Sequence, residues 1–142
     1  QSVDTFHKKL GKIMWDNVGM ARNKKGLEEA IVKIAELKKE FYSDLSIPGS
    51  AETVNNELEK ATRVADFLEL GELMAHDALQ REESCGGHFR EEFQTPEGEA
   101  LRDDKKFTYV AAWEYNSADG EPILNKENLN YEAIEVKQRN YK

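Results

Sequence analysis

The densest group of chemically active side chains lies between Arg81 and Arg90, where the sequence is Arg-Glu-Glu-Ser-Cys-Gly-Gly-His-Phe-Arg. The thiol of Cys85 and the imidazole of His88 are the kinds of group that form a nucleophile–base pair. Such a pair also needs a third group that orients the base and a site that stabilises an oxyanion. The sequence identifies neither, and we therefore predict no catalytic residue in this chain.

Zinc binding is a second chemistry open to this region, because Cys85, His88, His76 and Glu83 are all types that ligate zinc. A structural zinc site normally takes four ligands, most of them cysteine or histidine. The chain has one cysteine and three histidines in total, so we predict no metal ligand. A single cysteine also excludes an intrachain disulfide and suits a reducing compartment.

Composition and charge exclude several other functions. The 142-residue chain has a formal net charge of -8, which disfavours nucleic acid and anionic lipid as partners. No apolar run approaches the roughly 20 residues of a transmembrane helix, so we predict no direct membrane insertion. The glycine-rich phosphate loops G-x-G-x-x-G and G-x-x-x-x-G-K-[ST] are both missing from the sequence, so we predict no cofactor-binding residue.

Three amphipathic stretches with short connections predict a mainly α fold, an antiparallel up-down-up bundle of three helices. The third stretch carries two apolar rows, which indicates contacts on two sides. Gly71 lies within the second row and costs a helix about 1 kcal/mol relative to alanine, so we expect close packing there. We expect the first helix to follow an N-cap at Asp4 or Thr5 and to end at Gly19. The second should run from Lys24 or Lys25 to the turn at 46–50, and the third from Ala51 or Thr53 to Glu83. The two rows are Val54, Leu58, Ala61, Ala65, Leu68, Ala75 and Leu79, and Val64, Phe67, Met74 and Ala78.

After Arg90 the pattern changes to a C-terminal extension. We predict a loop over 93–106 and a β-hairpin made of strands at 107–115 and 131–136, with a turn at 118–122. The resulting domains are a bundle over 1–92 that includes the Arg81–Arg90 motif, and an extension over 93–142. The extension packs on the bundle or on a missing domain. The aromatic face of the first strand holds Phe107, Tyr109, Trp113 and Tyr115.

The motif itself is expected at the exit of the third helix. Arg81 and Glu83 would end the helix, and Gly86 or Gly87 would take the positive φ that terminates it. The simplest alternative is a helix C-cap whose polar residues face water.

Three stretches together resemble the C-terminal helical domain of the succinate dehydrogenase/fumarate reductase flavoprotein family. Residues 81–90 are similar to its R-x-E-S-R-G-x-H-x-R signature, residues 14–20 to M-W-[DE]-N-V-G-[IM], and residues 135–142 to the K-x-R-x-Y ending of its longer bacterial type. The chain departs from the signature at Cys85, where the family usually has arginine, and at Gly87, where alanine is common. The residues that match, to which we assign a structural, domain-docking role, are Arg81, Glu83, Ser84, Gly86, His88 and Arg90.

The resemblance implies a parent enzyme that interconverts succinate and fumarate at a covalently held FAD. Electrons would pass first to an iron–sulfur subunit, then to a quinone at a membrane anchor. The parent would be cytoplasmic and attached to the cytoplasmic membrane through its partner subunits. The family's FAD-binding and substrate-binding residues lie upstream, in FAD-binding and capping domains, and none maps onto this chain. We therefore expect the segment alone to be inactive and to be a piece of a longer chain.

Two alternatives remain open from the sequence. The C-terminal bundle of L-aspartate oxidase carries a similar E-S-R-G motif, but that family usually ends sooner after it, whereas residues 91–142 follow the motif here. The other alternative is a stand-alone helical interaction module with no enzymatic parent.

Overall fold

The computed structural model describes residues 1–117 and 120–138. It divides into two compact units, Gln1–Gln80 and Arg81–Lys142, so that the motif begins the second unit. The expected division into a bundle domain over 1–92 and an extension over 93–142 stays a prediction. The expected turn at 118–122 and the tail motif at 135–142 lie partly outside the described residues.

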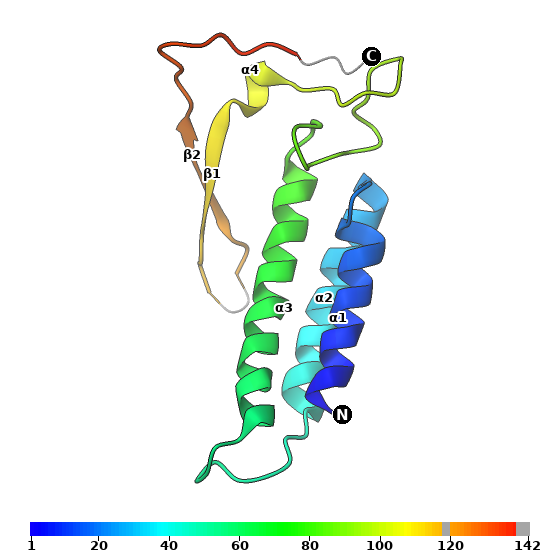
Figure 1. Cartoon of the computed structure of the whole chain (residues 1–142), viewed down its shortest axis with the longest axis vertical. Helices are drawn as coiled ribbons and strands as arrows, with labels where there is room; N and C mark the ends of the chain where they lie inside the picture. The colour runs from blue at the N-terminus through cyan, green and yellow to red at the C-terminus, as the bar shows by residue number, and fades with distance from the viewer. Residues whose placement is uncertain (118–119, 139–142) are drawn as a thin grey trace. The chain divides into compact units, whose positions relative to one another are not determined.

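The first unit is the predicted three-helix bundle. Its helices α1 (Val3–Val18), α2 (Lys24–Asp44) and α3 (Asn56–Gln80) run side by side in alternating directions (Figure 1). Each helix packs against both of the others. The core is apolar, and the rings of Phe6 and Phe41 meet edge to face with centroids 5.3 Å apart.

Capping side chains set helix starts that differ from the expected ones. α1 begins after Ser2, whose hydroxyl accepts a hydrogen bond from the Thr5 amide at 3.3 Å, so the N-cap expected at Asp4 or Thr5 was wrong. α3 begins only after Asn55, whose side-chain oxygen accepts from the amides of Glu57 and Leu58, both at 3.1 Å. An N-cap satisfies amides that have no partner within the helix, and this fixes the helix start.

The buried face of α3 draws on both predicted apolar rows and consists of small or branched residues. A Cβ added at Gly71 would lie 3.2 Å from Met14 Sδ and 3.4 Å from a Leu10 methyl group, which confirms the expected close packing. Val54 precedes the helix and is 95% exposed, so its place in the row was wrong. The buried residues of α3 are Ala61, Val64, Leu68, Gly71, Ala75 and Ala78.

An ion cluster joins α2 to α3 beside this core. The Lys38 ammonium lies 2.7 Å from a Glu72 carboxylate oxygen and 2.9 Å from one of Glu69. Burial lowers the pKa of Lys38, but the hydrogen bonds and charges of Glu72 and Glu69 outweigh it, so that its pKa is raised. The protonated lysine therefore stabilises the packed helices.

The second unit contains the short helix α4 (Asp104–Phe107) and an antiparallel hairpin of β1 (Tyr109–Glu114) and β2 (Ile123–Asn128) (Figure 1). The register pairs Tyr109 with Asn128 and Glu114 with Ile123. The hairpin is confirmed, but the second strand expected at 131–136 was wrong. Only two of the six β2 residues are large and apolar, so the strand shows no period-two pattern in the sequence.

The aromatic face of β1 is only partly as predicted. Tyr109 is buried and Trp113 is half-buried on the same face, while Val110 and Glu114 are exposed. Phe107 belongs instead to the short helix α4, which begins within the loop that was predicted over 93–106. Tyr115 lies beyond the end of β1, and its side chain is 74% exposed. Asp103 caps α4 by accepting from the Lys106 amide.

Substitutions at two glycines test the close approach of α1 and α3. We expect Gly71→Val to lower the free energy of unfolding by about 1–3 kcal/mol, because the added methyl groups overpack against Met14 and Leu10. Gly11 in α1 is the matched control, since nothing lies within 4 Å of its added Cβ. Gly11→Ala should raise the unfolding free energy by up to about 1 kcal/mol. Urea denaturation measures both, and a Gly71→Val protein as stable as wild type would contradict the packing.

A second test concerns Lys38, whose side chain is 18% exposed. We expect Lys38→Met to lower the unfolding free energy at neutral pH by about 1 kcal/mol. The pKa is raised in the folded state, so the contribution is complete below about pH 10.5 and is lost as the pH rises through the raised value. Lys33→Met removes an exposed pair with Glu29 and should change little. A Lys38→Met deficit that persists undiminished at the alkaline end of the pH series would contradict the assignment.

Candidate functional site

The candidate site is the Arg81–Arg90 motif, which lies just beyond the last residue of α3, Gln80. Arg81 and Glu83 are therefore outside the helix, contrary to expectation. Gly86 has the expected positive φ of 58°, but it does not terminate α3. It occupies a tight turn in which the Cys85 amide donates to the His88 carbonyl at 2.8 Å and the His88 amide donates back at 3.0 Å. A left-handed φ is accessible to glycine without strain, which explains glycine at this position.

Glu83 is a buried carboxylate, only 3% exposed. Arg81 Nη1 lies 2.9 Å from one of its oxygens, and the Asp103 amide donates to the other at 2.9 Å. Arg81 also donates to the Tyr109 carbonyl at 3.3 Å and stacks over the Tyr109 ring at 5.4 Å. A buried charge is tolerated only when it is paired and hydrogen-bonded. Glu83 therefore joins the motif to the start of α4 and, through Arg81, to β1.

Ser84 is fully buried and closes the motif into a loop. Its hydroxyl accepts from the Arg90 amide at 2.8 Å and donates to the Arg90 carbonyl at 3.1 Å. Its own amide donates to the Leu101 carbonyl at 2.8 Å. One small side chain thus bonds both backbone groups of Arg90, and the Arg90 carbonyl also accepts from the Phe93 amide at 2.9 Å. Buried polar groups require such partners.

Arg90 and His88 complete the arrangement. Arg90 is 2% exposed, its Nε lies 3.1 Å from a Glu92 carboxylate oxygen, and its guanidinium lies 5.3 Å from the centre of the Phe93 ring. The Nε2 atom of His88 lies 2.8 Å from the Arg81 carbonyl. The sequence left open that the polar residues of the motif form a helix C-cap and face water. This alternative was wrong for three of them, which are buried: Glu83, Ser84 and Arg90.

The arrangement is a hydrogen-bonded loop whose tip is exposed at Cys85, Gly86 and Gly87. Every fully buried side-chain nitrogen or oxygen among the described residues has a hydrogen-bond partner. No three His, Cys, Asp or Glu side chains within 1–117 and 120–138 are placed to hold a metal ion. A helix long and apolar enough to cross a membrane is likewise not found in the part of the chain that the structure describes.

The motif's main partners, the backbone groups of Leu101 and Asp103, were not predicted. They lie in the segment 93–106, which was expected to be a loop with no named contacts to the motif. Arg102 between them pairs with Asp104 at 2.6 Å and donates to the Lys137 carbonyl at 3.1 Å. Its hydrogen bond to Asp104 is the main reason that the pKa of Arg102 is raised. Backbone partners leave no residue-type signal, and this is why they were missed.

Comparison with known proteins identifies the family. The sequence model described as "Fumarate reductase flavoprotein C-term" matches residues 7–141. The chain belongs to this family. The match confirms the resemblance of the chain to the C-terminal domain of succinate dehydrogenase/fumarate reductase flavoproteins, and it does not favour L-aspartate oxidase or a stand-alone module.

Individual relatives agree with this assignment. A fumarate reductase (CoM/CoB) subunit of Methanothermobacter marburgensis is 35% identical over 84 residues, 59% of this chain and 15% of the relative. The fumarate reductase flavoprotein subunit of Proteus vulgaris is 31% identical over 115 residues, 81% of this chain and 18% of the relative. A solved E. coli quinol fumarate reductase FrdA is 27% identical with a TM-score of 0.76, covering 91% of this chain and 21% of that one. The chain thus spans only about a fifth of these relatives' length.

Ser84 offers the sharpest test of the loop. Ser84→Ala removes the buried hydroxyl that bonds the amide and the carbonyl of Arg90, and we expect it to lower the unfolding free energy of the second unit by about 1–3 kcal/mol. In a Trp15→Phe background, the fluorescence of Trp113 in β1 reports on that unit. Thr108→Val is the control, because the Thr108 hydroxyl lies in the same unit and makes an exposed bond to the Asp104 carbonyl. Equal small effects of the two substitutions would contradict the role of Ser84.

Proposed function

We propose that this chain is the structural C-terminal part of an FAD-dependent oxidoreductase that interconverts succinate and fumarate. The observation that carries the structural role is the buried, internally hydrogen-bonded motif. The carboxylate of Glu83 and the hydroxyl of Ser84 are engaged by groups of the same unit. Groups held in this way fix a loop in place and have little freedom to act on a substrate.

The proposed docking role uses the outside of the same loop. The tip at Cys85, Gly86 and Gly87 is exposed, and two backbone hydrogen bonds between Cys85 and His88 close the turn. A rigid, exposed turn is a surface that a neighbouring domain can contact with little loss of conformational entropy. In this proposal the tip faces the FAD-binding and capping domains of the same polypeptide.

The residues of this chain do not fit FAD. A dinucleotide is usually held by a glycine-rich strand-to-helix turn against its pyrophosphate, and no matching sequence occurs here. The two described strands form an antiparallel hairpin with no helix between them. FAD, and the hydride chemistry that it supplies, therefore belong to the upstream part of the parent in this proposal.

The proposed assembly follows from the kind of protein that the chain resembles. One solved relative is described as a quinol–fumarate reductase with menaquinol molecules; it is 26% identical with a TM-score of 0.79 and matches over 94% of this chain and 22% of its own. By analogy, the parent would pass electrons through an iron–sulfur subunit to a quinone. It would be a cytoplasmic protein held at the cytoplasmic membrane by its partner subunits.

The test compares this chain with the full-length parent protein encoded around it. We expect the 142-residue chain to be helical by circular dichroism, to carry no flavin absorbance and to reduce no dye with succinate. The full-length protein should carry flavin and reduce the dye. Flavin bound to the chain alone would contradict the structural role, and a full-length protein without flavin would contradict the proposed parent.

A further inference from the structure

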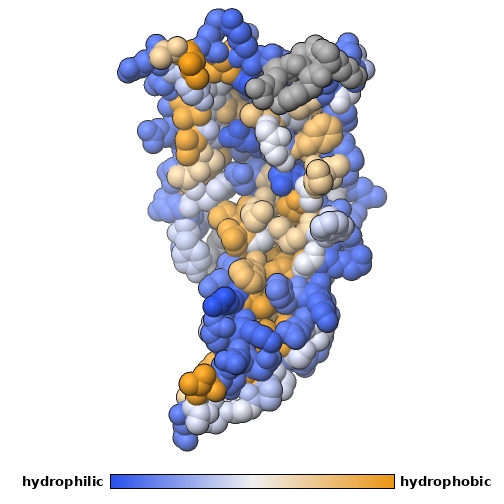
Figure 2. All heavy atoms as spheres, viewed as in Figure 1, coloured by the Kyte–Doolittle hydropathy of each residue, from blue (hydrophilic) through white to orange (hydrophobic). Residues whose placement is uncertain are grey.

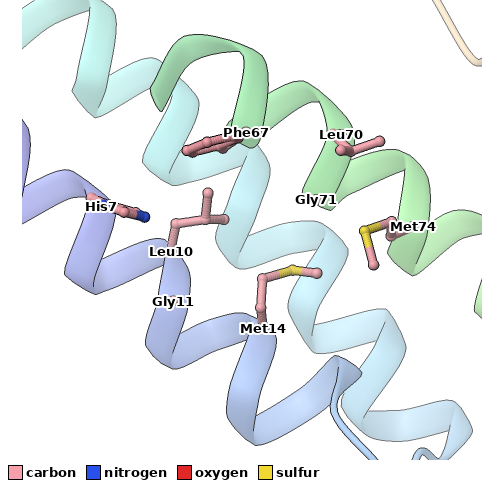
Figure 3. Close-up of a pocket in the computed structure, with 8 residues that line it drawn as sticks. All are labelled: His7, Leu10, Gly11, Met14, Phe67, Leu70, Gly71 and Met74. Carbon is pink, nitrogen blue, oxygen red and sulfur yellow. The ribbon is translucent and has the colours of Figure 1, made fainter. Parts of the chain in front are cut away.

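An apolar groove lies on the first unit between α1 and α3 (Figure 3). Leu10 and Met14 reach into it from α1, and Phe67 and Met74 line it from α3. The ring of His7, 5.7 Å from that of Phe67, forms its polar edge. The cavity has a volume of about 230 Å³ and no Lys, Arg, Asp or Glu among its lining residues.

The groove exists because α3 has a second apolar face. Phe67, Leu70 and Met74 follow one another at helical spacing and are 42%, 54% and 44% exposed. They lie beside, and not within, the buried face of the helix. The buried face of α3 already contacts both α1 and α2. Apolar residues that lie beside this face and stay exposed therefore indicate a further contact. Figure 2 shows apolar side chains exposed among hydrophilic ones on the visible face of the molecule, and contiguous exposure of this kind marks interaction sites.

The size and lining of the groove limit what can fill it. Sites for drug-sized ligands are usually about 300–1,000 Å³, so this cavity is smaller than a typical site of that kind. It is larger than the roughly 150 Å³ cavity that accommodates benzene, so one aromatic or large aliphatic side chain fits. Met14 and Met74 can adapt to such a group. Above Gly11 there is open space, through which a backbone can approach.

We propose that this groove docks an apolar segment of the upstream part of the same polypeptide, with one large side chain seated between Met14 and Met74. The inference rests on the proposed function. Relatives extend far beyond the matched region, which is only 15% of one and 22% of another. A segment of the same polypeptide is held at a high effective concentration near the groove, whereas a second copy must associate from solution.

Thiol labelling tests the occupant directly. A cysteine is introduced by Leu70→Cys in a Cys85→Ser background, in both the chain alone and the full-length parent. Val32→Cys is the matched control, because Val32 lies on α2 and is 57% exposed against 54% for Leu70. We expect labelling at position 70 to be at least about tenfold slower in the parent than in the chain alone, with position 32 nearly unchanged, because thiol reactivity follows exposure.

Each other outcome overturns the assignment. Equal labelling of position 70 in both proteins means that nothing upstream covers the groove, and equal slowing at positions 70 and 32 means general crowding. Slow labelling of position 70 in the chain alone means that the groove is already covered there. If the labelling rate depends on protein concentration, a second copy covers it; if the rate does not, other residues of the same chain cover it. Flavin absorbance of the parent distinguishes failure of the groove proposal from failure of the proposed function. If the parent carries flavin but position 70 stays accessible, the groove proposal is wrong and the proposed function is unaffected. The rate at which peroxide oxidises Met74, measured by mass spectrometry, compares the chain alone with the parent without any substitution.

Discussion

The organisation of the second unit depends on the pairing of one buried carboxylate. Glu83 is almost completely removed from water, and an unpaired charge in such a place costs several kcal/mol. Arg81 and the Asp103 amide both contact it, and Arg81 reaches on to the Tyr109 carbonyl. Positions far apart in the sequence are therefore fixed together, so the motif, the start of α4 and the start of β1 form one arrangement.

The two departures from the family signature, at Cys85 and Gly87, fall outside that arrangement. Cys85 stands where the family usually has arginine, and it is exposed at the tip of the turn. The buried contacts come instead from Glu83, Ser84 and Arg90, which all match the signature. The substitution therefore leaves the internal loop intact and changes only the surface that the tip presents. This separates the residues that build the loop from the residue that would contact a neighbour.

The sequence predicted the bundle because each helix repeats apolar residues at a clear helical period and opposes them with charges. It misplaced the starts of α1 and α3, where the side chains of Ser2 and Asn55 decide the boundary. The strand β2 escaped detection because four of its six residues are polar and it is held by ladder hydrogen bonds to β1. The four-residue helix α4 is too short to show a period.

The motif was located correctly, but its contacts were not predictable. Its residue types suggested surface chemistry, yet the partners of Ser84 are backbone groups of Arg90 and Leu101. Backbone partners are set by the path of the chain and not by residue type. The docking role of the motif stays a prediction, because the described contacts are all within its own unit.

The motif, in this interpretation, stabilises the protein and takes no part in its chemistry. The most direct measurement is the turnover per bound flavin of the full-length parent carrying Glu83→Gln, taken together with its unfolding midpoint. We expect a lower midpoint with turnover per flavin within about twofold of wild type. An unchanged midpoint with turnover per flavin reduced by about tenfold or more would contradict a purely structural role.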